Sequence, residues 1–214
     1  MDIIKSDFDD RCETINHLHN HIEFMTLQSK SVTTVLILKS SLFVAIYNNI
    51  EATFFALFEQ IHKEVSSVDY HALSQRLKVL FVEYHFNKIS SINPGSLKKL
   101  QECELKFPQL MEYLDKRKLF SGNLDVRKAK DIFYTYGIPF FEFHPDVSES
   151  ILTVKNKRNS IAHGEVTLLD ASSGFNNAKM KRLVDDNENF LTKLISIVGL
   201  YLDGRKYLSA VNAA

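Results

Sequence analysis

The sequence predicts an all-α fold, an up-and-down helical bundle with an inserted segment of shorter helices. Glycine and proline are scarce, with seven and four among 214 residues, which disfavours a turn-rich β architecture. All four prolines lie between residues 94 and 145, so the flanking parts can form long uninterrupted helices. Hydrophobic residues make up 45% of the chain, enough for a substantial core, and many recur at three- and four-residue steps.

Three helices are predicted before the first proline. Residues 5–28 carry apolar side chains at helical spacing with polar positions between them. Residues 33–66 are apolar nearly all round, as expected of a helix at the centre of a bundle. Residues 69–91 predict a third helix, whose apolar face holds Leu73, Leu77, Leu80 and Phe81.

The middle of the chain predicts shorter helices, at residues 96–105, 108–117 and 124–136. Ser121 or Asn123 is expected to cap the last of these, and Gly137 to end it. Because the stretch from about 94 to 145 is too short for a large core of its own, we expect a helical elaboration within one domain spanning residues 1–214.

Two further helices follow the prolines. Ser148 is expected to cap a helix that runs to about His163, and residues 176–206 form the last helix, with a continuous apolar stripe.

Composition limits the possible functions. The formal net charge is zero, so nucleic acid would have to bind through local basic patches. Cys12 and Cys103 have no metal-type spacing and fit a reducing compartment. The N-terminus does not resemble a signal peptide, and polar residues interrupt the apolar stretch 35–58, which indicates a buried helix rather than a membrane span. We therefore expect a soluble cytoplasmic protein.

Histidines alternate at positions 17, 19 and 21. On a helix only His17 and His21 share a face, and the sequence offers no obvious third ligand. Solvated helix histidines are therefore favoured over a metal site, and we expect no cofactor.

Residues 155–164 hold the most informative pattern. On a helix, Lys155, Asn159 and His163 form one stripe, with Arg158 about 100° round from Asn159. Gly164 is the residue type that favours the left-handed conformation just past a helix C-terminus. The pattern predicts a helix end that presents a guanidinium and an imidazole together.

This pair suits acid–base chemistry on a phosphodiester. If the ligand is RNA, His163 would act as general base on a ribose 2′-hydroxyl or as general acid on the leaving 5′-oxygen. Arg158 would stabilise the developing charge, with Asn159 in support. A symmetric dimer would supply the second histidine. A positive surface for the RNA backbone could come from Lys155, Lys157, Lys179, Lys181 and Arg182. The 179–182 group is equally well explained as a solvated helix face.

The spacing alone is not specific, because Arg11 and His17 satisfy it loosely as well. A structurally ordinary capped helix end remains an alternative interpretation. On the second helix, Tyr47 and Glu51 are four residues apart and share a face. A buried carboxylate needs a partner, so Glu51 is expected to meet a cation from another helix, either as a structural contact or in support of the Arg158/His163 site.

The segment from Arg158 and Asn159 to His163 and Gly164 resembles the R-N-x-x-x-H motif of the HEPN superfamily (higher eukaryotes and prokaryotes nucleotide-binding domains). The Tyr47–Glu51 segment, residues 121–127 and Phe175 are similar to parts of bacterial HEPN-like nuclease domains of the MAE type. The likeness extends over most of the chain, but only the Arg–His motif is specific.

The resemblance implies a dimeric all-α bundle with both motifs at the interface, and frequently a metal-independent endoribonuclease of a toxin–antitoxin or antiphage defence system. It makes Arg158 and His163 catalytic, with Asn159, Glu51 and Tyr47 supporting. Some relatives carry a tyrosine two positions after the histidine, where antitoxins attach nucleotides. This chain has Glu165 there, which argues against that mode of regulation.

Three functions remain open at this stage. The first is a dimeric ribonuclease that acts as a toxin or defence effector, with a cognate antitoxin or partner protein. The second is a non-catalytic HEPN module that binds nucleotide, RNA or protein. The third is an accessory subunit whose dimer interface is its whole function.

Overall fold

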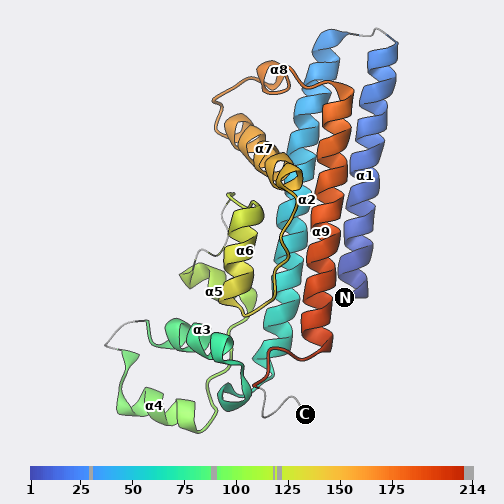
Figure 1. The fold of residues 1–214 in the computed structure, drawn as a ribbon. Helices are drawn as coiled ribbons and strands as arrows, with labels where there is room; N and C mark the ends of the chain where they lie inside the picture. The colour runs from blue at the N-terminus through green and yellow to red at the C-terminus, as the bar shows by residue number, and fades with distance from the viewer. Residues whose placement is uncertain (29–30, 88–90, 118, 120–121, 210–214) are drawn as a thin grey trace. The chain divides into compact units, whose positions relative to one another are not determined.

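The computed structural model describes residues 1–28, 31–87, 91–117, 119 and 122–209. These residues form helices, and no β-strand occurs among them apart from a single bridge between Leu73 and Leu208. The all-α prediction is confirmed. Figure 1 shows the helices, which are α1 (Asp2–Leu27), α2 (Val32–Ser66), η1 (Tyr70–Ala72), α3 (Gln75–His85), α4 (Pro94–Gln101), α5 (Leu110–Lys116), α6 (Val126–Thr135), α7 (Pro145–Ala162), α8 (Leu168–Ala171) and α9 (Asn177–Asp203).

The chain groups into two compact units. Unit 1 comprises residues 1–54, 122–129 and 142–195, and unit 2 comprises residues 55–121, 130–141 and 196–214. Both α2 and α9 contribute to each unit. The expected elaboration at 94–145 is therefore shared between the two, and a single domain over the whole chain stays a prediction.

In unit 1, the long helices α1, α2 and α9 lie alongside one another (Figure 1). Their facing sides bury apolar side chains, among them Phe8, Ile22, Phe43, Ile46, Phe190 and Leu194. Arg11 of α1 donates to Asn49 Oδ1 (2.9 Å) and to Thr53 Oγ1 (3.2 Å) of α2. Arg11 therefore has a structural role in packing α1 on α2, although its spacing from His17 is similar to that of Arg158 from His163.

His19 differs from the expectation of solvated histidines. It lies four residues after Ile15 and three before Ile22, on the buried face of α1, and is 1% exposed. Neither ring nitrogen has a hydrogen-bond partner in the described part of the chain. The expectation was wrong for His19 because its position follows the apolar period of the helix, whereas His17 and His21 are exposed.

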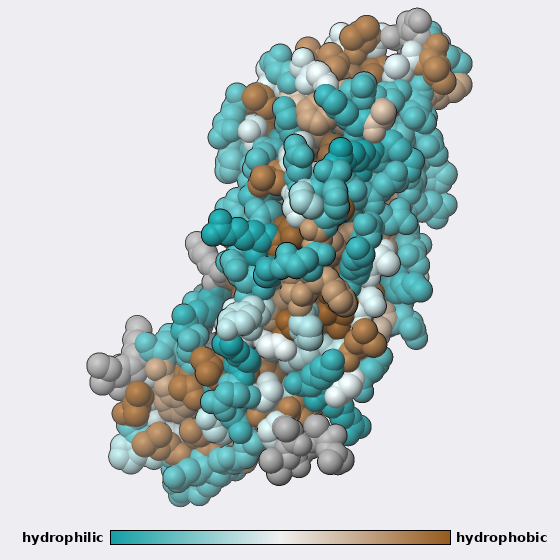
Figure 2. Space-filling view, in the orientation of Figure 1, coloured by the Kyte–Doolittle hydropathy of each residue, from teal (hydrophilic) through white to brown (hydrophobic). Residues whose placement is uncertain are grey.

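Unit 2 is built around the C-terminal third of α2. Phe58 meets the rings of Phe133 and Tyr136 edge-on, with centroids 5.8 and 4.8 Å away. The hydroxyl of Tyr201, on α9, donates to the carbonyl of Tyr136 at 3.3 Å. Figure 2 shows brown side chains gathered over α3 and α4, where Val79, Val82, Ile92 and Leu97 are exposed.

Several predicted boundaries were wrong. The third helix begins at Gln75 rather than 69, because Ser74 is an extended N-cap and Leu73 is buried from an extended position that pairs with Leu208. α6 is capped by Asp125, whose carboxylate accepts from the Lys128 N–H at 2.9 Å, and not by Asn123; Ser121 lies outside the described residues.

Boundaries at α7 and α8 also differ from the prediction. α7 begins at Pro145, a residue preferred at the first helical position, so Ser148 lies inside the helix; the ring of His144 caps it instead. The four-residue helix α8 was too short to leave a periodic signal.

α2 is the one helix, within the residues described, long and apolar enough to cross a membrane by length and composition. Just over half of its most apolar window, 56%, is buried inside the protein. This burial is typical of the core helix of a soluble protein, as the polar interruptions of 35–58 had indicated.

Candidate active site

The C-terminus of α7 ends in a tight backbone motif that positions His163. Gly164 adopts the left-handed conformation, with φ of +69°. Its N–H donates to Ile161 O at 3.1 Å, and the Glu165 N–H donates to Ser160 O at 2.9 Å. These two bonds form a Schellman motif, which satisfies the last carbonyls and stops the helix. The predicted stop at Gly164 is confirmed, and His163 stands exposed at the C-cap.

Arg158 is held by α2 and by its own neighbour. Its Nη2 lies 3.2 Å from Glu51 Oε2, its Nη1 donates to Asn159 Oδ1 at 3.1 Å, and its guanidinium carbon lies 4.7 Å from the Tyr47 ring centroid. A guanidinium with an ion pair on one edge and an aromatic ring beneath it has little rotational freedom. The side chain of Arg158 remains 24% exposed, so part of the group faces solvent.

Tyr47 provides a neutral platform for this arginine. Its ring is fully buried, and its hydroxyl accepts from the Leu124 N–H at 2.8 Å. Burial is the main reason that the pKa of Tyr47 rises to about 12; the nearby Glu51 carboxylate also raises it. Tyr47 therefore stays protonated at neutral pH and supports Arg158 by contact rather than by proton transfer.

The segment 122–125 completes the surroundings of Arg158. Gly122 has φ of +67°, and a β-carbon there would lie 3.3 Å from Arg158 Nη1. Asn123 Oδ1 accepts from Asn159 Nδ2 at 3.2 Å. A side chain at position 122 would crowd the guanidinium, so the glycine leaves room for the arginine as well as permitting the turn.

Lys155 faces the same segment. Its Nζ lies 2.6 Å from Asp125 Oδ2, and both side chains are largely buried, at 15% and 18% exposed. Burial alone would raise the pKa of Asp125. The hydrogen bond from Lys155 and those from the backbone N–H groups of Lys128 and Arg127 outweigh burial, so the pKa is lowered. Lys155 would have to leave Asp125 to contact RNA.

Lys157 lies on a different face of α7. Its Nζ is 5.4 Å from the ring centroid of Phe175, in the connection between α8 and α9. It is partly exposed and contacts this connection rather than the group around Arg158.

Five of the residues singled out from the sequence thus come together in unit 1. Arg158, Asn159, Glu51 and Tyr47 make direct contacts, and Lys155 joins them through the 122–125 segment. His163 lies one turn further along α7. Its ring makes no hydrogen bond or ion pair within the described ranges.

Sequence reasoning missed the roles of Gly122, Asn123 and Asp125 as neighbours of the motif. They lie more than 30 residues before it, and no local pattern links the two segments. In the described chain, no group of three or more His, Cys, Asp or Glu is placed to hold a metal ion.

A family model described as HEPN_MAE_28990-like HEPN matches residues 2–207. The chain belongs to this HEPN family. The match includes every described helix, from α1 to α9. Comparisons with curated proteins and with solved structures found no match.

Family membership gives the Arg158–His163 segment its context. The R-N-x-x-x-H motif of this HEPN chain lies on the last two turns of α7, with Arg158 turned toward α2 and His163 at the exposed C-cap. The ion pair expected of Glu51 is present, and its partner is the motif arginine itself. Whether these residues act catalytically stays a prediction.

Proposed function

We propose that this HEPN protein is a metal-independent endoribonuclease that cleaves RNA as a homodimer, with Arg158 and His163 as catalytic residues. The observation that carries the proposal is that these two side chains differ in their contacts and exposure. Arg158 is fixed by its contacts and its side chain is 24% exposed, whereas His163 is exposed at a helix end and makes no hydrogen bond or ion pair within the described ranges. A fixed cation and a free imidazole at the same helix end meet the needs of 2′-hydroxyl attack on phosphorus.

In the proposed reaction, His163 removes the proton from a ribose 2′-hydroxyl, and the 2′-oxygen forms a bond to the adjacent phosphorus. The bond from phosphorus to the 5′-oxygen breaks, and that oxygen takes a proton from the His163 of a second protomer. The products are a 2′,3′-cyclic phosphate and a 5′-hydroxyl. Arg158 stabilises the charge on the phosphorane oxygens.

Glu51, Tyr47 and Asn159 position Arg158 in this scheme. Lys157, which is partly exposed, is available to the RNA backbone, and Lys155 would contribute after exchanging its partner Asp125. We place the enzyme in the cytoplasm of a bacterium, in a toxin–antitoxin or antiphage defence system, with a cognate antitoxin or partner protein.

The test is cleavage of end-labelled RNA by the purified protein in EDTA, with analysis of the product ends. The His163→Ala and Arg158→Ala variants should each lose about 10²- to 10⁴-fold in kcat/KM. His17→Ala is a matched control, since His17 is an exposed helix histidine with a similarly spaced arginine, and it should retain full activity. DNA of the same sequence should resist cleavage. Activity that survives in His163→Ala would contradict the assignment.

The dimer requirement is tested by mixing. If each reaction needs two copies of His163, adding a tenfold excess of His163→Ala protein should suppress wild-type activity far more than dilution does. Sedimentation should give twice the chain mass. Suppression no greater than dilution would contradict a shared site.

A second function, a non-catalytic module that binds nucleotide, RNA or protein, is favoured by one observation. Arg158 and Lys155 already have the carboxylate partners Glu51 and Asp125, so the group around them is close to neutral. Tight RNA binding with no turnover between pH 5 and 9 would establish this function instead.

A further inference from the structure

Unit 1 has a pocket of about 250 Å³ between α7 and α9. It is separate from the group around Arg158. The residues that line it are Glu149, Ser150 and Thr153 of α7, Phe175 of the α8–α9 connection, and Lys179, Arg182 and Leu183 of α9. The volume lies just below the range of drug-sized pockets and fits a single small ring system.

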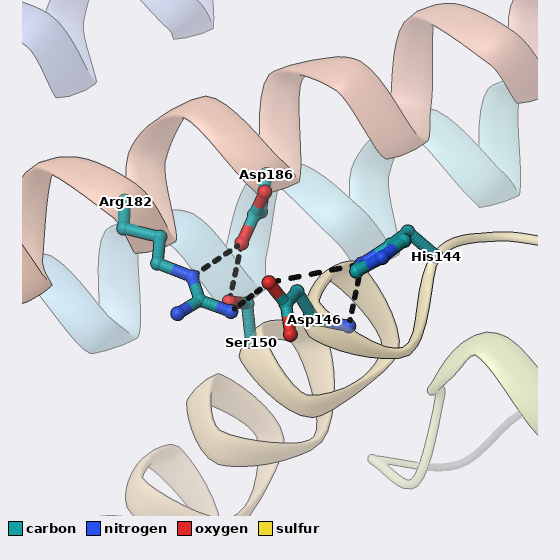
Figure 3. Close-up of polar contacts among 5 residues, drawn as sticks. All are labelled: His144, Asp146, Ser150, Arg182 and Asp186. Atoms are coloured by element: carbon teal, nitrogen blue, oxygen red, sulfur yellow. Dashed lines mark hydrogen bonds and ion pairs between the residues drawn. The ribbon is translucent and has the colours of Figure 1, made fainter.

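Two of the lining side chains are fixed by carboxylates (Figure 3). Arg182 lies between Asp146, 3.1 Å from Nη2, and Asp186, 3.5 Å from Nε. The Ser150 hydroxyl donates to the same Asp186 carboxylate. Arg182 and Ser150 therefore form a rigid, charge-balanced wall and are not free to bind a ligand strongly.

Other polar groups of the pocket are unengaged. Glu149 and Thr153 lie four residues apart on one face of α7, and neither side chain has a hydrogen bond or ion pair within the described ranges. On the opposite wall, exposed Lys179 reaches only the Gly174 carbonyl, at 3.4 Å. The pocket thus offers an acceptor and a hydroxyl on one side and an ammonium on the other.

Phe175 contributes the aromatic surface. Its ring is partly exposed, rests edge-to-face on Phe43 with centroids 5.1 Å apart, and has Lys157 Nζ 5.4 Å from its centroid. Its carbonyl accepts from the buried Lys39 at 2.8 Å, which fixes the backbone beneath it. A supported aromatic ring flanked by cations suits a planar ligand that carries negative charge.

We propose that this pocket binds one nucleobase of the RNA substrate together with its phosphate, which rests on the proposed ribonuclease function. The base packs on Phe175 and Leu183, its polar edge meets Glu149 and Thr153, and the phosphate lies toward Lys179. The Glu149 carboxylate accepts from an exocyclic amino group, so adenine, cytosine and guanine are favoured over uracil, which has no amino group and places carbonyl oxygens at the corresponding positions.

The location on α7 indicates which nucleotide this is. Glu149, Asn156 and His163 are spaced by seven residues and are all exposed, so they form one strip along the helix. Glu149 and His163 are separated by about 20 Å along the axis, from the rise of about 1.5 Å per residue. The base therefore belongs to a nucleotide a few positions from the cleaved bond, and the pocket governs affinity and sequence preference rather than bond breakage.

The first experiment measures binding of AMP, CMP, GMP and UMP to the full chain carrying His163→Ala, by calorimetry. Thr153→Trp fills the pocket and should weaken binding of AMP, CMP and GMP at least tenfold. Thr192→Trp, an exposed position elsewhere on α9, is the matched control and should bind as well as the parent. Glu149→Gln should remove the preference over UMP while the fold is unchanged. Equal binding by the two tryptophan variants, or a preference for UMP, would overturn the proposal.

The second experiment uses cleavage by the otherwise wild-type chain. Thr153→Trp should raise KM for RNA at least tenfold with kcat within about twofold, and AMP should inhibit competitively. Inhibition by AMP that lowers kcat without competing would identify a regulatory site for free nucleotides and overturn the assignment to RNA. If no variant cleaves RNA, the ribonuclease function fails, while the calorimetric comparison still decides whether the pocket binds nucleotides.

Discussion

The polar centres of the two units differ in how completely their groups are satisfied. In unit 2, the ring of His62 is fully buried, with Nδ1 2.8 Å from the Pro108 carbonyl and Nε2 2.7 Å from the Tyr136 hydroxyl. A carbonyl only accepts, so Nδ1 carries the proton and Nε2 accepts from Tyr136. In unit 1, Arg158 is paired with Glu51 but its side chain stays 24% exposed, and His163 is exposed with no hydrogen bond or ion pair within the described ranges.

The polar groups of unit 2 stabilise the fold, whereas those of unit 1 remain available to a substrate. Burial lowers the pKa of His62 to about 4, and it raises the pKa of Tyr136 well above its ordinary value. Both groups are neutral near pH 7, and their hydrogen bonds are made within the protein. In unit 1, by contrast, neither Arg158 nor His163 is fully buried, so a substrate can reach both.

The largest expected contrast comes from replacing the two histidines in turn. His62→Ala removes a packed ring and leaves the Pro108 carbonyl and Tyr136 hydroxyl unpaired, which should lower the free energy of unfolding by roughly 2 to 4 kcal/mol. His163→Ala should change it by no more than about 0.5 kcal/mol, as for other exposed positions, while abolishing cleavage. Urea denaturation and RNA cleavage on both variants measure this. If the two substitutions destabilised the protein equally, the proposed difference between a structural His62 and an available His163 would be wrong.

Acid should weaken the protein through His62. The unfolded histidine binds a proton below pH 6.5, whereas the folded one does so only below about pH 4. Because the unfolded state binds more protons between these values, stability is full above pH 6.5 and declines as pH falls toward 4, by about 3 kcal/mol in total. Denaturation at several pH values should show this slope in the wild type and a shallower one in His62→Gln. Parallel slopes would mean that His62 does not titrate as described.

Glu51→Gln tests whether the ion pair between Glu51 and Arg158 positions the arginine for cleavage. Without the carboxylate, Arg158 keeps the Tyr47 ring and Asn159 but loses its ion pair, so kcat should fall by about tenfold, less than for a direct loss of Arg158. The melting temperature should change little, since the pair is partly exposed. A purely structural contact would give the reverse pattern, with a lower melting temperature and the same kcat.

Gly164→Ala should have the smallest effect. An alanine with φ near +69° is strained, and the expected loss of stability is about 1 kcal/mol. Gly199 of α9 is the matched control. It lies within a helix with open space around it, so Gly199→Ala should stabilise the protein by about 0.5 to 1 kcal/mol. Two shifts of the same sign would show that the cap at Gly164 needs no left-handed residue.

The long helices were predictable because each carries its apolar period over many turns. The helix expected at 5–28 is Asp2–Leu27, and that expected at 176–206 is Asn177–Asp203. The helix expected at 69–91 failed because Leu73 fits the apolar spacing of α3 from an extended position. Periodicity reports burial, and a short segment can be buried in more than one backbone conformation.

Some features of the candidate site were likewise predictable from the local sequence, and others were not. The helix end at Gly164 and the need of Glu51 for a cation follow from local chemistry. The placement of Gly122 and Asn123 against Arg158 and Asn159 depends on tertiary contacts between distant segments, which leave no pattern in one sequence. The buried position of His62 is a contact of this kind as well.

The ion pairs of unit 1 have a consequence for any nucleic acid that binds there. Arg158, Lys155 and Arg182 are neutralised by the protein's own carboxylates, which act as built-in counterions. A strand that displaces a carboxylate exchanges one anion for another and releases few of the mobile cations that surround free RNA. The logarithm of affinity should therefore fall only gently with the logarithm of salt concentration. A protein built this way would select RNA by the shape and the bases it presents more than by its charge.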